Sequence, residues 1–317
     1  MDSMPALLKP RAAAVGVKVA VLSPASTPEA GRVARGMEAL GTLGFLPVES
    51  SHMLTRGPLY FAGTVEQRLL DLHAAFADDT VRLLFATRGG YGSNHLLDGL
   101  DMDLLAAHPK PFLGYSDLTA LQVTLLDTIH LPAFHGPMIS PDFACEDGVH
   151  LPSLLAALAG EPYTVGAAEG LRLLRVGQKP QPVRGTLYGG CLSILVALLG
   201  TAFEPRTEGK ILFLEDVGVK PYHLHRMLWQ LQQAEKLDGV QAVIFGEMLD
   251  CVSPGARPDL LEDVILSALE EFEGPIAIGL RSGHVSRSNV TLTLGVTAEL
   301  TQTEAPELRL LEAAVAR

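Results

Sequence analysis

A serine stands at the end of a short apolar stretch, directly before a helical pattern. The segment is Gly114-Tyr115-Ser116-Asp117. At such a strand-to-helix turn the Ser116 hydroxyl is exposed, and the following helix contributes free N–H groups and the positive end of its dipole. These groups suit acyl transfer, in which a nucleophile attacks a carbonyl and an oxyanion forms. The match to the G-x-S-x-G elbow is partial because Leu118 replaces the last glycine, and an ordinary helix N-cap is the alternative.

A glycine-rich loop is the second candidate for chemistry. The segment Arg88-Gly89-Gly90-Tyr91-Gly92-Ser93 follows an expected strand. Its glycines permit positive φ angles and a close approach of the backbone to a ligand. Such a loop can offer N–H groups to a carboxylate or an oxyanion. It is not G-x-G-x-x-G and lacks the P-loop lysine, so nucleotide binding is not indicated, and a tight turn is the alternative.

A carboxylate and a histidine complete the candidates. Glu215 directly follows an apolar strand, at the end where α/β sheets bind ligands, and it could fix a histidine's tautomer. His284 lies in the polar loop 281–289 and could act as a general base near neutral pH. Seen alone, each residue also fits a solvated surface position. His135 follows an expected strand, so a packing role is predicted for it, and a place in the lining of the same cleft is the alternative.

Short apolar runs alternate with helical patterns in the first half of the chain. Strands are expected at 17–22, 45–48, 81–86, 111–114 and 131–134. Helices are expected between them, one of them capped by Thr64. This alternation predicts an α/β fold with a mostly parallel sheet and helices on both of its faces.

Residues 161–182 break this rhythm and lack a long amphipathic pattern. Beyond them, a Gly189-Gly190 turn is expected to lead into a helix, and further strands and helices alternate to the end. The predicted organisation is a flexible tail (1–14), an N-terminal α/β domain (15–160), a linker (161–182) and a smaller C-terminal α/β domain (183–317).

The composition excludes several classes of protein. Hydrophobic residues make up 48% of the 317 residues and charged residues 19%, so folded cores are expected rather than disorder. A net charge of −12 disfavours nucleic acid as a partner. The three cysteines are dispersed, so neither a disulfide framework nor a metal site is expected. No apolar signal core and no long apolar run occur, which predicts a cytoplasmic protein without membrane contact.

The four motifs together are more specific than any one of them. RGGYGS after a strand, GYSD opening a helix, LED after a strand and GH in a late loop occur in this order. The set resembles the LD-carboxypeptidase family of serine peptidases, which also contains the microcin-immunity peptidases, from about residue 17 to 311. The resemblance implies that Ser116 is the nucleophile, His284 its general base and Glu215 the residue that orients the base.

The resemblance carries further expectations about the fold and the site. It implies an oxyanion hole formed by the N–H groups of Asp117, Gly89 and Gly90. It implies an N-terminal layered domain and a smaller C-terminal domain, with the catalytic residues assembled across the cleft between them. No metal and no cofactor are expected, and the family is commonly dimeric, so a homodimer is predicted.

The expected substrate is a murein tetrapeptide of peptidoglycan recycling. The bond to be cleaved joins the L-centre of a diamino acid to a terminal D-Ala. An exopeptidase must hold the free carboxylate, and Arg88, Arg281 or Arg287 could do so as bidentate partners. Tyr91 and Tyr115 flank the expected site and are further candidates for substrate contacts.

Three other interpretations remain open. A microcin-immunity-like peptidase would cleave peptidyl- or aminoacyl-nucleotides and needs an aromatic surface, but Trp229, the single tryptophan, is predicted to lie in the core. A glutamine-amidotransferase-like enzyme would use a cysteine, and Cys191 begins a helix after Gly190. A non-catalytic two-domain protein would bind a small ligand without turnover.

Overall fold

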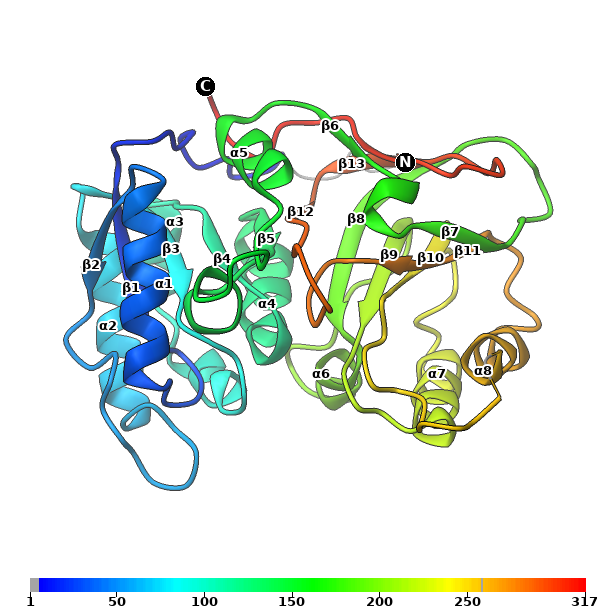
Figure 1. The fold of residues 1–317 in the computed structure, drawn as a ribbon, viewed down its shortest axis with the longest axis horizontal. Helices are drawn as coiled ribbons and strands as arrows, with labels where there is room; N and C mark the ends of the chain where they lie inside the picture. The colour runs from blue at the N-terminus through cyan, green and yellow to red at the C-terminus, as the bar shows by residue number, and fades with distance from the viewer. Residues whose placement is uncertain (1–5, 258) are drawn as a thin grey trace.

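The computed structural model describes residues 6–257 and 259–317, which form two β-sheets that lie side by side (Figure 1). The first sheet has six strands in the order β12-β5-β4-β3-β1-β2. Their bounds are Lys18–Leu22 (β1), Leu46–Glu49 (β2), Val81–Ala86 (β3), Phe112–Gly114 (β4), Ala133–His135 (β5) and Leu292–Leu294 (β12). Strands β1 to β5 pair in parallel and β12 pairs antiparallel with β5, which confirms the expected α/β fold with a mostly parallel sheet.

Five α-helices and three shorter helical segments accompany this sheet. The α-helices are α1 (Ala30–Thr42), α2 (Val65–Ala77), α3 (Met102–Ala107), α4 (Thr119–Ile129) and α5 (Leu151–Ala159). The shorter segments are η1 (Ser93–Gly99), η2 (Ser116–Leu118) and η3 (Ile139–Phe143). Helix α4 lies between the two sheets and contacts β8 and α6 (Figure 1). Thr64 caps α2 as predicted, since its hydroxyl accepts the Gln67 N–H and the Gln67 side chain accepts the Thr64 N–H.

The second sheet has eight strands in the order β6-β14-β13-β8-β9-β10-β11-β7. Their bounds are Tyr163–Val165 (β6), Arg172–Arg175 (β7), Val183–Cys191 (β8), Lys210–Glu215 (β9), Ala242–Gly246 (β10), Ile276–Leu280 (β11), Thr297–Leu300 (β13) and Leu308–Leu310 (β14). The central strands β8 to β11 are parallel, and the outer strands pair antiparallel. The helices α6 (Leu192–Ala197), α7 (Pro221–Gln233) and α8 (Leu260–Ala268) lie on one side of this sheet, below it in Figure 1, and η4 is Ala167–Glu169.

The segment predicted as a linker, 161–182, has regular structure. It contains β6 and β7, which form the two opposite edges of the eight-stranded sheet. The expected Gly189-Gly190 turn is likewise part of a strand, because both glycines lie inside β8. Antiparallel partners from the end of the chain complete this sheet, and a local pattern cannot reveal such distant pairing.

The part of the predicted tail that the structure describes is held in place; residues 1–5 lie outside the described range. The Ala12 N–H donates to Ala316 at 2.8 Å, and the Ala13 N–H donates to Leu158 at 2.9 Å. Lys9 forms an ion pair with Glu312. The tail is therefore ordered over these residues, because the last residues of the chain supply its hydrogen-bond partners.

The lengths of the helices can be compared with the prediction that the protein has no membrane contact. The three longest helices, α1, α2 and α7, have 13 residues each. Within the described ranges, none of the helices has the length and apolar character that a membrane span requires.

Candidate active site

Ser116 occupies a strained turn between β4 and α4. Its φ angle is 63°, in the left-handed region that residues with a side chain rarely adopt. Strand β4 ends at Gly114, and the short helix η2 begins at Ser116 itself. Ser116 is half-buried between buried neighbours. Strain of this kind is typical of the nucleophile elbow of hydrolases, in which the turn exposes the hydroxyl above the sheet.

The glycine-rich loop lies directly against this turn. A Cβ atom added to Gly89 would lie 2.7 Å from the Ser116 Cβ and 3.2 Å from the Asp117 backbone nitrogen. Only glycine fits there, so the backbone of the loop reaches the serine. The Asp117 carboxylate fixes the loop by accepting the Ser93 N–H at 2.8 Å. The structure thus brings the residues predicted for the oxyanion hole together.

Glu215 and His284 form a hydrogen-bonded pair. The Glu215 Oε2 lies 2.8 Å from the His284 Nδ1 and accepts the His284 backbone N–H at 3.0 Å. Glu215 is the last residue of β9 and is fully buried. Two glycines make room for it: a Cβ on Gly246 or Gly283 would lie 2.7 or 2.5 Å from atoms of the Glu215 side chain. The carboxylate therefore fixes the ring so that the Nε2 is free to act as a base.

Tyr115 connects the serine turn with this pair. Its ring meets the His284 ring edge to face, with 5.1 Å between the ring centroids. No hydrogen bond joins the Ser116 and His284 side chains in the described structure, and contacts between a nucleophile and its base often tighten only in the substrate complex. The histidine is thus adjacent to the residue before Ser116. Tyr115 itself is buried, so it packs within the site, and the predicted substrate contact is not supported.

The two members of the pair shift each other's pKa. Burial raises the pKa of Glu215, but the charge and hydrogen bonds of His284, together with the nearby His135 ring, outweigh it and hold this pKa at about 2. Burial lowers the pKa of His284, and the adjacent Glu215 carboxylate outweighs this effect and raises the pKa above its ordinary value. Glu215 is therefore ionised at neutral pH, as an orienting carboxylate must be.

The raised pKa of His284 predicts an acid limb in the pH profile. A general base must be neutral, so kcat/KM should fall as the pH drops through the pKa of His284. Because Glu215 raises this pKa, the midpoint should lie above that of an unperturbed histidine, about 6.5. Initial rates from about pH 5 to pH 9 would measure it. A midpoint clearly below that of free histidine, or the absence of an acid limb, would contradict the assignment.

The contact between Gly89 and Ser116 predicts a strong effect of one methyl group. Gly89→Ala should displace the serine turn and reduce kcat by about 100-fold or more, as the loss of an oxyanion donor does. Gly41→Ala is the matched control, because nothing lies within 4 Å of a Cβ at that helical position. Gly41→Ala should retain full activity and gain some stability. Equal activity of the two variants would remove Gly89 from the site.

Arg88 and Tyr91 line a cavity beside the glycine-rich loop. Its volume is about 660 Å³, and Arg56, Tyr60 and Gly90 also line it. Both arginine side chains are exposed. Arg56 and Arg88 could pair with an anionic group in this cavity, whose lining also includes the Glu29 carboxylate. The cavity adjoins the serine turn, because Gly90 directly follows the glycine that contacts Ser116.

The other two arginines predicted to bind the substrate carboxylate, Arg281 and Arg287, do not line this cavity. The Arg281 guanidinium donates to the Ala168 carbonyl at 2.6 Å, so it braces the loop before β7. Arg287 is exposed in the loop that carries His284. Arg88 is therefore the arginine that the structure favours for a substrate carboxylate.

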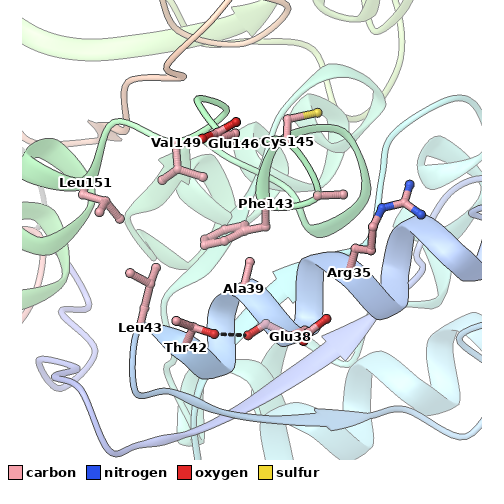
Figure 2. Close-up of a pocket in the computed structure, with 11 residues that line it drawn as sticks. Arg35, Glu38, Ala39, Thr42, Leu43, Phe143, Cys145, Glu146, Val149 and Leu151 are labelled. Atoms are coloured by element: carbon pink, nitrogen blue, oxygen red, sulfur yellow. Dashed lines mark hydrogen bonds between the residues drawn. The ribbon is translucent and has the colours of Figure 1, made fainter.

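A second cavity, of about 480 Å³, lies between α1 and the segment 143–151 (Figure 2). Arg35 and Glu38 of α1 and the free thiol of Cys145 line it, whereas Ser116, Glu215 and His284 do not. The described structure thus shows no nucleophile–base pair in this cavity.

Two further sequence-based interpretations are affected by the structure. Burial raises the pKa of the Cys191 thiol well above its ordinary value, so this cysteine is a poor nucleophile and the amidotransferase alternative loses support. The core position predicted for Trp229 is wrong: its side chain is 53% exposed, because Leu224, Leu228 and Leu231 form the buried face of α7. Trp229 therefore offers an exposed aromatic surface and does not disfavour a nucleotide substrate.

The fold and the site together define a two-domain α/β serine hydrolase, and comparisons specify the family. The family model of the LD-carboxypeptidase N-terminal domain matches residues 19–136, and that of the C-terminal domain matches residues 184–300. A probable murein peptide carboxypeptidase of Bacillus subtilis is 35% identical over 301 residues, which are 93% of this chain and 92% of that protein. The murein tetrapeptide carboxypeptidase of Pseudomonas aeruginosa is 37% identical over 235 residues, 71% of this chain and 74% of that protein.

A solved structure extends the comparison to the fold. The microcin self-immunity protein MccF in complex with glutamyl sulfamoyl guanosine superposes with a TM-score of 0.87 at 25% identity, covering 98% of this chain and all of that one. The chain belongs to the LD-carboxypeptidase family and is a serine-type carboxypeptidase of that family.

Proposed function

We propose that this enzyme releases the terminal D-Ala of murein tetrapeptides by hydrolysing the L,D-peptide bond, with Ser116, His284 and Glu215 as its catalytic residues. The observation that carries the proposal is the buried Glu215–His284 pair beside the strained serine turn. The two murein carboxypeptidases among the relatives support the choice of substrate.

The geometry suggests how the reaction proceeds. The His284 Nε2 takes the proton of the Ser116 hydroxyl as the Oγ attacks the scissile carbonyl. The N–H groups of Asp117 and of the Gly89-Gly90 loop stabilise the oxyanion. When the C–N bond breaks, His284 gives the proton to the departing amine of D-Ala. Water, deprotonated by the same histidine, then hydrolyses the acyl-enzyme and frees Ser116.

The cavity of about 660 Å³ beside the glycine-rich loop is the proposed site for the terminal carboxylate of the substrate. Arg88→Ala should raise KM by about 10- to 100-fold, the value of one hydrogen-bonded charge pair, and change kcat less. Steady-state kinetics with the tetrapeptide would measure both constants. The control is Arg226→Ala on the exposed face of α7, which should leave both unchanged. An unchanged KM in Arg88→Ala would move the carboxylate site elsewhere.

The substrate is tested by a direct comparison of two compounds. The purified protein is incubated with a murein tetrapeptide that ends in an L-diamino acid–D-Ala bond, and free D-Ala is followed by mass spectrometry. Release by the wild type and none by Ser116→Ala supports the proposal. Cleavage of an aminoacyl-nucleotide instead would favour the second candidate, which the likeness to MccF and the exposed Trp229 keep open. Binding without turnover of either compound would favour a non-catalytic ligand-binding protein.

The cytoplasmic location and the homodimer are further parts of this proposal. Light scattering of the purified protein would give the mass of the particle in solution. A particle of one chain mass would contradict the homodimer without bearing on the catalytic residues.

A further inference from the structure

The loop that carries His284 is attached at both ends to buried side chains from the first half of the chain. At one end, the Ser282 Oγ lies 2.9 Å from the Nδ1 of His135. At the other end, the Asn289 Nδ2 donates to the Asp142 Oδ1 at 3.1 Å. All four side chains are buried. The loop therefore has two fixed points on the half of the molecule that carries Ser116.

Asn289 also closes the loop on itself. Its Oδ1 accepts the Gly283 N–H at 3.0 Å, and its Nδ2 donates to the Gly283 carbonyl at 3.0 Å. Gly283 immediately precedes His284 in the chain. Asp142 holds the asparagine in this orientation, and its second oxygen accepts the Met138 N–H at 2.7 Å. An amide, with one donor and one acceptor group, is what this set of partners requires.

His135 contacts the catalytic carboxylate as well as the loop. Its Nε2 lies 3.7 Å from the Glu215 Oε1, and neither buried atom has a hydrogen-bond partner within the described residues. If the Ser282 hydroxyl donates to Nδ1, the ring proton sits on Nε2 and points at Glu215. His135 also pairs with Gly114 in the sheet, two residues before Ser116. One side chain thus links the serine strand, the carboxylate and the histidine loop.

We propose that His135 and Asp142 are positioning residues, which set the His284 loop relative to Ser116 through Ser282 and Asn289. The proposal rests on the proposed catalytic roles of Ser116 and His284. Both side chains are buried, so they act through the general base and not by direct contact with a substrate. Removing either contact lets the histidine ring shift, and a shift of about 1 Å at a reacting group costs about 100-fold in rate.

The test is whether the effect of these contacts depends on His284. Asn289→Ala and Ser282→Ala are made in the wild type and in His284→Ala, and the rate of Ser116 labelling by a fluorophosphonate is measured in each. In the wild type, Asn289→Ala should slow labelling by about 10- to 100-fold, and Ser282→Ala, which removes one hydroxyl, by a smaller factor. In the His284→Ala background neither change should slow it further. Ser267→Ala, the loss of a hydroxyl at an exposed position of α8, is the control and should label like the wild type.

Two results would overturn the proposal. The first is an equal loss in both backgrounds, which would mean that the contacts support the fold and not the base. The second is no loss in the wild type. Ser282→Ala keeps the test readable if Asn289→Ala does not fold, since it leaves the buried amide in place.

Labelling with a fluorophosphonate tests the positioning proposal independently of the proposed murein substrate. A fluorophosphonate reacts with an activated serine whatever its natural substrate is. Labelling at Ser116 without D-Ala release would reject the murein substrate and still allow the positioning test. Absence of labelling at Ser116 in the wild type would reject the positioning role together with the catalytic serine.

Discussion

Ser116→Ala is expected to lower kcat by at least about 10⁴-fold while the fold is retained. Without the hydroxyl no acyl-enzyme forms, and only binding and oxyanion stabilisation remain. The substitution removes one oxygen from a half-buried position and keeps the strained backbone, so the free energy of unfolding should change by no more than about 1 kcal/mol. Initial rates of D-Ala release and urea unfolding followed by circular dichroism would measure the two quantities.

The control for this variant is Ser267→Ala, on the exposed side of α8. It makes the same chemical change far from the glycine-rich loop in sequence and should keep wild-type activity. Activity of Ser116→Ala within about tenfold of the wild type would show that another group is the nucleophile.

Glu215→Gln should have the second largest effect. The amide has nearly the same size, but it can donate to the Nδ1 of His284 and so favour the wrong tautomer, which cost a serine protease about 10⁴-fold in kcat. The substitution also removes the negative charge that raises the pKa of His284, so the acid limb of the residual activity should move to lower pH. Rates as a function of pH would show both effects.

The exposed carboxylate Glu208 provides the comparison for this variant. Glu208→Gln removes the same charge outside the site and should change neither the rate nor the acid limb. If Glu215→Gln kept the wild-type profile, the carboxylate would not act on the histidine, and the orienting role would have to be given up.

The parallel core of the molecule could be predicted from the sequence. The run 81–86 was expected as a strand and is β3 to the residue. Buried parallel strands are continuous apolar runs, and the helices between them have caps such as Thr64, so both signals are local. The serine turn was visible for the same reason, since a strand, a small residue and a helical pattern follow one another.

The outer strands and the ends of the chain could not be predicted in this way. β6 and β7 are short, half-exposed and paired with strands more than a hundred residues away. Residues 10–13 depend on partners near residue 316 and at the end of α5. Such pairings are decided by the assembled fold and leave no local periodicity.

The reactive groups of the candidate site could be predicted from the sequence. The buried residues that hold these groups in place could not. Glu215 and His284 stand at strand ends and in a polar loop, where sequence patterns indicate function. Asp142 is a single polar residue in the five-residue segment η3 and Asn289 one in the loop after β11, so nothing local marks them. For His135 a signal existed, a histidine directly after an apolar strand, but packing was predicted and its contacts with Ser282 and near Glu215 were not.

The central claim is that Ser116 is a nucleophile activated by His284. The most direct measurement is the mass of the intact protein after reaction with a fluorophosphonate, followed by mapping of the modified peptide. The account predicts one adduct per chain, on Ser116, absent from Ser116→Ala and formed far more slowly in His284→Ala. An adduct on another residue, or no adduct on the wild type, would contradict it.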